Sequence, residues 1–307
     1  MISVKNITKK FADFLAVDDL SFEVKAGDVV GFLGPNGAGK STSMKMITGF
    51  LRPDAGDVVV AGYSVSQDPI EVQKRIGYLP EGAPAYGDMT VLQFLSFIAD
   101  VREISASDKQ SRIADVIAKV QLESVLNKPI DNLSKGFKRR VGLAQAIIHD
   151  PDILILDEPT DGLDPNQKHQ VRRLIQNLAT NKIVVVSTHI LEEVTAVCNR
   201  VIIIANGKLC FNDTPDALLK QSKYHNAITL HAKGSVEPSL FDSVASINSV
   251  VMSATPNSLT IFPNKGADVL QEVQNVIKDN DLMIEQLYIE QGRLDEVFRD
   301  ITGEAAN

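Results

Sequence analysis

The segment GPNGAGKST, from Gly34 to Thr42, constrains this 307-residue chain more than any other part of its sequence. It satisfies the pattern GxxxxGK[ST], it follows the apolar run DVVGFLG, and it leads into KSTSMKMITGF, which has helical spacing. A glycine-rich loop between a strand and a helix is the context that a phosphate-binding loop requires. We therefore expect a strand, a loop and a helix that together cradle the phosphates of a nucleotide.

The loop residues predicted to contact the nucleotide are Gly34, Pro35, Asn36, Gly37, Ala38, Gly39, Lys40, Ser41 and Thr42. The glycines let the main chain approach phosphate oxygens without an intervening side chain. The free N–H groups at the start of the helix then face the anion. We expect Lys40 to reach the β- and γ-phosphates, Ser41 to ligate Mg²⁺, and Thr42 to contact the region of the α-phosphate.

The segment ILILDEP, from Ile153 to Pro159, has the pattern of a buried strand that ends in two carboxylates. Asp157 is placed to hold Mg²⁺ through a water molecule, and Glu158 to polarise a water that attacks the γ-phosphate. An acidic pair at a strand end also suits a helix cap or a solvated turn. The phosphate loop upstream favours the metal and water roles.

Strand and helix patterns alternate along residues 1–222. The strand-like segments include DVVGFLG, DILILDEP, IVVVST and RVIIIANGKL. This alternation predicts an α/β fold, a phosphate-loop NTPase cassette with a mixed and largely parallel sheet that helices cover. Between about residues 90 and 140, apolar residues recur at spacings of three and four, which predicts a separate helical subdomain.

The pattern changes after residue 222, and we expect residues 223–307 to form a small α+β accessory or regulatory domain. AITLHAK, INSVVMSA, SLTIFP and LMIEQLYIEQ are strand-like, whereas PSLFDSVA and ADVLQEVQNVIKDN are helix-like. Their β-α-β-β-α-β order is that of a ferredoxin-like unit. The closing segment GRLDEVFRDITG predicts a last helix.

Charge and composition exclude some classes of function. The formal net charge of −8 argues against a general nucleic-acid binder, which needs an excess of Lys and Arg. The N-terminal segment MISVKNITKKF has no apolar core of the signal-peptide type. The longest apolar runs fall far short of the ~18 residues that span a bilayer, so we expect any membrane role to depend on a partner.

Three further motifs resemble those of ATP-binding cassette (ABC) proteins. LSKGFKRRVGLAQAII, from Leu133 to Ile148, resembles the LSGGQ signature, DGLDP resembles the D-loop, and STH ending at His189 resembles the switch histidine. With the phosphate loop and the acidic pair they make five motifs in the family order, and the resemblance covers roughly residues 2–220. The resemblance implies an ATP-hydrolysing subunit that powers a membrane transporter.

The family motifs also imply roles for particular residues. Phe11 would stack on adenine, and Val17 would line the same face. Asp164 would cross a dimer interface, and His189 would reach the γ-phosphate and hold the attacking water. Glu81 stands where the family has a glutamine that meets Mg²⁺, water and the membrane subunit, and it adds a negative charge beside the triphosphate.

The signature departs from the family at two positions. Ser134 and Gly136 match, and the resemblance implies that they contact the nucleotide bound to the opposite subunit. Lys135 replaces a glycine and either attracts that anion or is simply solvated. Phe137 replaces a glutamine, cannot donate as glutamine would, and is expected to face the helical subdomain.

The resemblance leaves two classes of function to compare. The first is the ATPase subunit of an exporter, using ATP and Mg²⁺, with a second ATPase subunit, in a homodimer, and a separate transmembrane permease as partners. Such a subunit lies peripherally on the cytoplasmic face of the plasma membrane. The alternative is a soluble ABC ATPase that acts on ribosomes or nucleic acid, which the single phosphate loop, the lack of a long coiled coil and the acidic charge disfavour.

Overall fold

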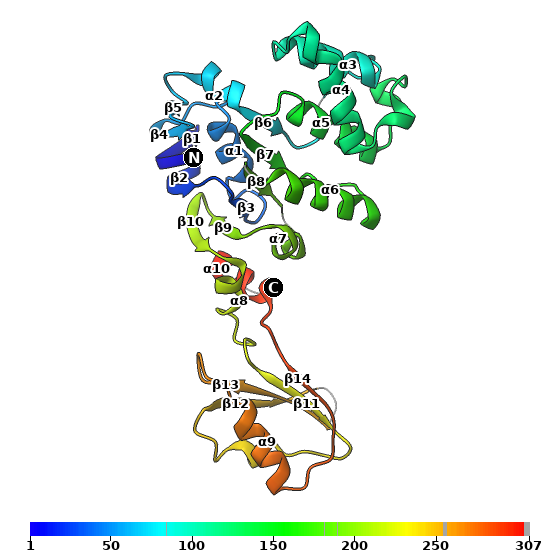
Figure 1. The fold of residues 1–307 in the computed structure, drawn as a ribbon. Coiled ribbons are helices and arrows are strands. Elements are labelled where there is room, and N and C mark those ends of the chain that lie inside the picture. The colour runs from blue at the N-terminus through cyan, green and yellow to red at the C-terminus, as the bar shows by residue number, and fades with distance from the viewer. Residues whose placement is uncertain (84, 181, 189, 254–256, 304–307) are drawn as a thin grey trace. The chain divides into compact units, whose positions relative to one another are not determined.

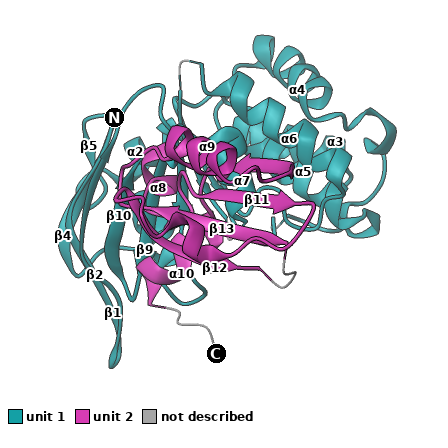
Figure 2. Cartoon of the chain, turned by 90° about the horizontal axis from the view of Figure 1, so that it is seen from below, with its two compact units in different colours: residues 1–215 teal, residues 216–307 magenta. Residues whose placement is uncertain are grey.

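The structure is a computed structural model of the chain, and it describes every residue except 84, 181, 189, 254–256 and 304–307. Contacts divide the chain into two compact units, residues 1–215 and residues 216–307, which Figure 2 draws in teal and magenta. The sequence-based boundary after residue 222 lies a short way beyond this division. Among the described residues, no helix is both long enough and apolar enough to cross a bilayer.

The main sheet of the first unit has six strands in the order β10-β9-β3-β8-β7-β6. Neighbouring strands are parallel except β9 and β10, which confirms the predicted largely parallel sheet. Every residue of β3, β7 and β8 is buried, as expected where helices cover a parallel sheet. The strands are β3 (Val29–Leu33), β6 (Ile76–Leu79), β7 (Ile153–Asp157), β8 (Ile183–Ser187), β9 (Arg200–Ala205) and β10 (Lys208–Asp213).

A second, antiparallel sheet in this unit has the strand order β2-β1-β4-β5. One buried cluster joins residues of both sheets and of α1, and in it the ring centroids of Phe22 and Phe32 lie 5.7 Å apart. This packing holds α1 and the loop before it between the sheets. The elements are β1 (Ile2–Phe11), β2 (Phe14–Val24), α1 (Lys40–Ile47), β4 (Ala55–Val60), β5 (Tyr63–Ser64) and α2 (Pro69–Arg75).

The expected helical region contains α3 (Val91–Val101), α4 (Ala106–Val120) and α5 (Lys135–Ile147). A capping box between Thr90 and Gln93 begins α3, and Ser105 caps α4. Their apolar faces share one core with buried residues of β6, β7, β8 and α6 (Pro165–Leu178). α7 (Leu191–Val197) follows β8.

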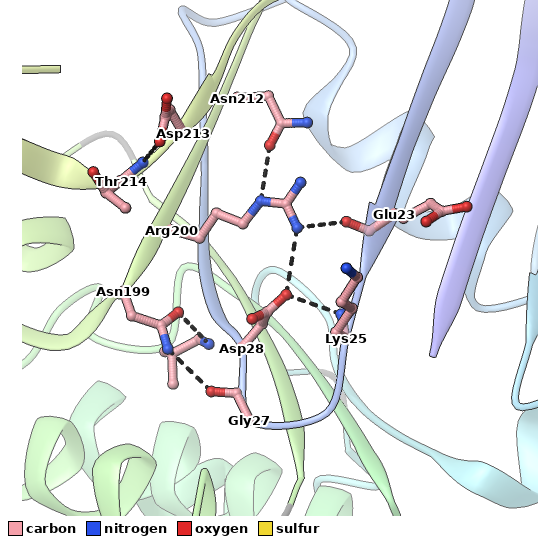
Figure 3. A network of polar contacts seen from close by, with 10 residues as sticks. Glu23, Lys25, Gly27, Asp28, Asn199, Arg200, Asn212, Asp213 and Thr214 are labelled. Carbon is pink, nitrogen blue, oxygen red and sulfur yellow. Dashed lines mark hydrogen bonds and ion pairs between the residues drawn. The ribbon is translucent and has the colours of Figure 1, made fainter. Parts of the chain in front are cut away.

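A polar network joins β2, β9 and β10 of the first unit (Figure 3). The guanidinium of Arg200 on β9 donates to Asn212 Oδ1 on β10 over 2.9 Å and to the main-chain oxygen of Glu23 on β2 over 2.7 Å. Asn199 Nδ2 donates to the main-chain oxygen of Gly27 over 3.0 Å. These bonds attach the antiparallel β9–β10 pair to the entry of β3, the strand that leads into the phosphate loop.

The second unit contains a four-stranded antiparallel sheet in the order β12-β13-β11-β14 (Figure 1). The short helix expected in PSLFDSVA is present only as a single 3₁₀ turn at Pro238–Phe241. The ferredoxin-like assignment stays a prediction. The elements are α8 (Pro215–Leu219), β11 (Ile228–Ala232), β12 (Ile247–Met252), β13 (Ser258–Pro263), α9 (Leu270–Asp279), β14 (Ile284–Ile289) and α10 (Leu294–Thr302).

Residues 216–222, which the sequence-based boundary placed with the cassette, group with the second unit. Ser222 Oγ donates to Glu296 Oε2 on α10 over 2.9 Å and accepts from the main-chain N–H of Arg293 over 3.1 Å. Lys223 Nζ lies 3.0 Å from Glu296 Oε1. Helix α10 is thereby attached to the segment with which this unit begins.

Candidate nucleotide-binding and hydrolysis site

The glycine-rich loop lies between β3 and α1, in the place that the sequence predicts. Gly37 and Gly39 have φ angles of 81° and 99°, which few residues other than glycine adopt without strain. A Cβ at Gly39 would overlap the main-chain oxygen of Ala16, and one at Gly34 would overlap that of Ile204. A Cβ at Gly37 would meet nothing within 4 Å. The loop is therefore held tightly from behind and is open at Gly37.

Lys40 begins α1, and its ammonium lies over the loop. Nζ donates to the main-chain oxygen of Gly34 over 2.6 Å and to that of Pro35 over 3.0 Å. Burial lowers the pKa of Lys40, and nearby carboxylates act in the opposite direction. These carboxylates are Glu158, Asp157 and Glu81. The fold thus brings the loop lysine together with all three predicted carboxylates, which come from two other strand ends.

Asp157 and Glu158 lie at the end of β7, beside the end of β8. Asp157 is 2% exposed, and its Oδ1 accepts from Ser187 Oγ. The main-chain N–H of Glu158 donates to the oxygen of Ser187 over 3.1 Å. Glu158 has a φ of 51°, a left-handed conformation that costs about 1–3 kcal/mol and persists only where its surroundings hold it. This turn directs the chain away from the sheet directly after Asp157.

The end of β6 brings two further groups to the site. Glu81 follows the strand and is exposed. Tyr78, which the sequence analysis did not select, lies on β6, and burial, assisted by the charges of Asp157 and Glu81, raises the pKa of Tyr78 to about 12. Its hydroxyl oxygen is buried and has no hydrogen-bond partner among the described residues. Tyr78 therefore remains a neutral phenol beside the carboxylates.

The signature segment and the D-loop lie against each other. Ser134 caps α5, its Oγ accepting from the main-chain N–H of Phe137 over 3.4 Å, and Asp164 caps α6 in the same way. A Cβ at Gly162 would lie 3.4 Å from Cβ of Lys135, and one at Gly136 would come within 2.6 Å of Gln167 Oε1. The small residues at both positions let the two segments approach closely.

The family resemblance implied a position for three further side chains, and the outcome in the structure differs from one to the next. Phe137 packs against the core that includes the helical subdomain, as expected. Phe11 ends β1, is 47% exposed, and has Lys9 Nζ 5.7 Å from its ring centroid, so its ring is accessible for stacking. Val17 is 0% exposed, and its Cγ2 would lie 3.3 Å from a Cβ at Gly39. The expectation for Val17 is corrected: its side chain supports the loop from behind and offers no surface to a base. His189 lies outside the described residues.

A buried carboxylate that the sequence analysis did not select lies close to this site. Glu193 on α7 is 5% exposed, and its Oε2 accepts from Thr160 Oγ1 over 2.5 Å. Lys168 Nζ and Arg172 Nη2 from α6 each lie 3.4 Å from Glu193 Oε1. In the sequence, the only feature that points to Glu193 is the presence of a carboxylate among the apolar positions of LEEVTAV.

The residues present fit an Mg²⁺–nucleotide complex. Among the described residues, no three His, Cys, Asp or Glu side chains form a metal-binding group. Mg²⁺ characteristically binds through one or two carboxylates, waters and substrate phosphates instead, with oxygen donors throughout. Asp157, Glu81 and the hydroxyl of Ser41 are oxygen donors of this kind, and the loop at Gly37 is open for phosphates.

Comparison with known proteins agrees with this geometry. A profile of the ABC transporter family matches residues 17–161. The chain is 37% identical over 220 residues to the Nod factor export ATP-binding protein I of Burkholderia orbicola (strain AU 1054), covering 71% of this chain and 72% of that protein. It is 38% identical over 223 residues to the probable multidrug ABC transporter ATP-binding protein YbhF of Escherichia coli (strain K12), covering 72% of this chain but only 38% of that relative's length.

A solved structure has the same fold as the cassette. It is the dimeric ATP-binding cassette MJ0796 in a post-hydrolysis state bound to ADP and Pi, with a TM-score of 0.65 and 25% identity over 70% of this chain and 98% of that one. The loop, the buried parallel sheet and the acidic pair define a phosphate-loop nucleoside-triphosphatase. Within that class, this chain belongs to the ABC transporter family, among its ATP-binding proteins.

Proposed function

We propose that this chain binds and hydrolyses ATP and thereby powers a membrane exporter. The observation that carries the proposal is the convergence of Lys40 with carboxylates from the ends of β6 and β7. The cation proposed to bind phosphates therefore lies near the carboxylates proposed to act on water or a metal. The names of the relatives, which describe multidrug and Nod factor export, support transport over a role on ribosomes or nucleic acid.

The chain's own residues account for binding. The main-chain N–H groups of the loop and the ammonium of Lys40 bind the phosphates, and the ring of Phe11 stacks on the base. Asp157, Glu81 and Ser41 would hold Mg²⁺, which supplies charge neutralisation at the β- and γ-phosphates when bound.

Hydrolysis needs a water molecule aligned with the γ-phosphate. Glu158 accepts a hydrogen bond from this water and takes its proton as the new bond to the γ-phosphorus forms, while the bond between that phosphorus and the β-phosphate oxygen breaks and ADP leaves. The main chain of Glu158 is in a left-handed conformation, with its N–H donating to the oxygen of Ser187. His189 is assigned to the γ-phosphate and the same water on the family motif.

Two copies are proposed to close on two ATP molecules, each site using the loop of one chain and the signature of the other. Ser134, Gly136 and Asp164 would act across this interface, where the start of α5 offers unpaired N–H groups to an anion. The dimeric state of the neighbouring cassette structure supports this arrangement. A separate transmembrane permease, bound at the cytoplasmic face of the plasma membrane, would convert closure and opening into transport.

Fractionation of cells tests the proposal and its alternative. A tagged Glu158→Gln chain, expressed in its native host and lysed with ATP and Mg²⁺, should sediment with membranes and remain bound to a polytopic membrane protein after mild detergent extraction. Wild-type chain without nucleotide is the reference. Recovery of the tagged chain with ribosomes or nucleic acid, and its absence from membranes, would reject the exporter function.

A further inference from the structure

The guanidinium of Arg139 lies among main-chain oxygens of the hydrolytic site. Arg139 is on α5, the helix that begins at the signature, and it is 5% exposed. Its Nη1 donates to the oxygen of Pro80 over 3.1 Å. Its Nη2 donates to the oxygens of both Asp157 and Glu158. One side chain thus joins the signature helix to the ends of β6 and β7.

These three acceptors belong to the residues on which the proposed chemistry depends. Pro80 directly precedes Glu81, and Asp157 and Glu158 are the proposed metal-binding and water-orienting residues. The main chain of Glu158 is in a strained conformation, with a φ of 51°. Such a conformation needs contacts that hold it. Arg139 binds its carbonyl, while Ser187 accepts its N–H over 3.1 Å.

The burial of this cation needs a reason, because a buried charge is costly unless it is paired or hydrogen-bonded. Burial lowers the pKa of Arg139, and nearby carboxylates oppose that effect. They are Asp161, Asp157, Glu158 and Glu81. Carbonyl oxygens and a cluster of negative charge together stabilise the guanidinium at this place. The planar guanidinium of arginine can donate to several acceptors at once. A lysine ammonium or a glutamine amide matches the same set of acceptors less well.

We propose that Arg139 is a positioning residue that links the signature helix to the hydrolytic carboxylates of the same chain. The proposal rests on the proposed function, in which Ser134 and Gly136 contact the nucleotide of the partner subunit. When binding of that nucleotide displaces the start of α5, Arg139 transmits the displacement to the main chain of Glu158. Each chain then hydrolyses its own ATP faster when its own signature is engaged, so the two sites of the dimer are coupled.

Steady-state hydrolysis by the full chain tests this link. The variants are Arg139→Gln, Arg139→Lys and, as a matched control, Arg173→Gln, which removes an exposed guanidinium from α6. We expect Arg139→Gln to lower kcat by about 10-fold or more, equivalent to about 1.4 kcal/mol in the barrier. The Kd for ATP, measured by equilibrium titration, should change by less than about 2-fold, and the Hill coefficient for ATP should fall toward one. Arg139→Lys should recover part of kcat, and the control should match wild type.

The outcomes separate this proposal from a purely structural role and from the proposed function. Unchanged kcat and Hill coefficient in Arg139→Gln overturn the proposal. So does a loss of kcat that accompanies an equal loss of ATP affinity and of thermal stability, because a general loss of folding predicts all three together. If Arg139→Gln does not fold, Arg139→Lys carries the same comparison. A wild-type chain that binds ATP without hydrolysing it overturns the proposed function, and this inference with it.

Discussion

The Nζ atom of Lys40 lies 2.6 Å from the main-chain oxygen of Gly34, so the loop lysine lies back across its own loop. A second loop oxygen, that of Pro35, lies 3.0 Å from the same nitrogen. The ammonium is therefore held by weak neutral acceptors at the place where phosphates are proposed to bind. Exchange of these carbonyls for anionic phosphate oxygens makes the hydrogen bonds charge-assisted on both sides and strengthens them.

Replacement of this lysine should weaken nucleotide binding itself. Hydrogen bonds to charged groups contribute about 1.5–3 kcal/mol, so Lys40→Ala should raise the Kd for ATP by roughly 10- to 100-fold. Titration with a fluorescent ATP analogue measures the effect. Lys45→Ala, an exposed lysine on the same helix, is the control. Equal affinities for wild type and Lys40→Ala would reject the phosphate-loop assignment.

Removal of the carboxylate charge at Glu158 should separate binding from hydrolysis. Glu158→Gln should reduce turnover by ~10²-fold or more, the size of a general-base contribution, while ATP binding persists. We also expect a dimer that is stable with ATP, seen by size-exclusion chromatography. Asp152→Asn, an exposed carboxylate just before β7, should leave turnover intact. Near wild-type turnover in Glu158→Gln would show that another group orients the water.

The signature should act on the nucleotide of the partner subunit. Ser134→Arg and Lys40→Ala chains should each be inactive alone, the first because a bulky cation blocks the start of α5. In a mixed dimer both defects fall in one shared site and leave the other intact, so mixing should recover part of the activity. Phosphate release against the mixing ratio measures this. Full activity of Ser134→Arg alone would exclude a role for the signature in hydrolysis.

Two glycines with similar backbone angles should respond differently to alanine. Gly39 and Gly27 have φ angles of 99° and 85°, and a left-handed conformation costs a side-chain-bearing residue about 1–2 kcal/mol. A Cβ at Gly39 also overlaps the oxygen of Ala16, whereas one at Gly27 meets nothing within 4 Å. Overpacking adds about 1–3 kcal/mol, so urea denaturation should find Gly39→Ala clearly less stable than Gly27→Ala. Equal losses would contradict the tight packing behind the loop.

Acid should destabilise the first unit through His149. Burial, with a smaller effect of the charge on Arg102, lowers the pKa of His149 from 6.5 to about 4. The imidazole of the unfolded chain therefore takes up a proton as the pH falls through 6.5, whereas that of the folded chain does so only near pH 4. The free energy of unfolding is thus highest above pH 6.5 and decreases as the pH falls toward 4. This group alone should cost about 2 kcal/mol between pH 7 and pH 5. Urea denaturation at both pH values should show a smaller difference in His149→Gln, whereas His169→Gln, on the exposed face of α6, should behave as wild type. An unchanged difference in His149→Gln would remove His149 as a cause.

Features that depend on neighbours in the chain were predictable from the sequence. The loop from Gly34 to Thr42, the strand before Asp157 and the amphipathic helices each follow from a local pattern of glycines or apolar spacing. The parallel sheet follows from the alternation of such patterns. The short helix expected in PSLFDSVA forms only as a 3₁₀ turn at Pro238–Phe241, because an isolated helical turn this short gains few hydrogen bonds.

The sequence by itself therefore determined the class of the fold, the phosphate loop and the acidic pair, because each follows from local patterns of residues along the chain. Tertiary structure alone decided which side chains share a space with them. Val17 was expected at the base and is instead buried behind Gly39. Tyr78 and Arg139 were not selected, yet they lie with Asp157, from which they are distant in the chain. Burial and hydrogen bonding of this kind arise only when separate strands and helices pack, so no local pattern contains them.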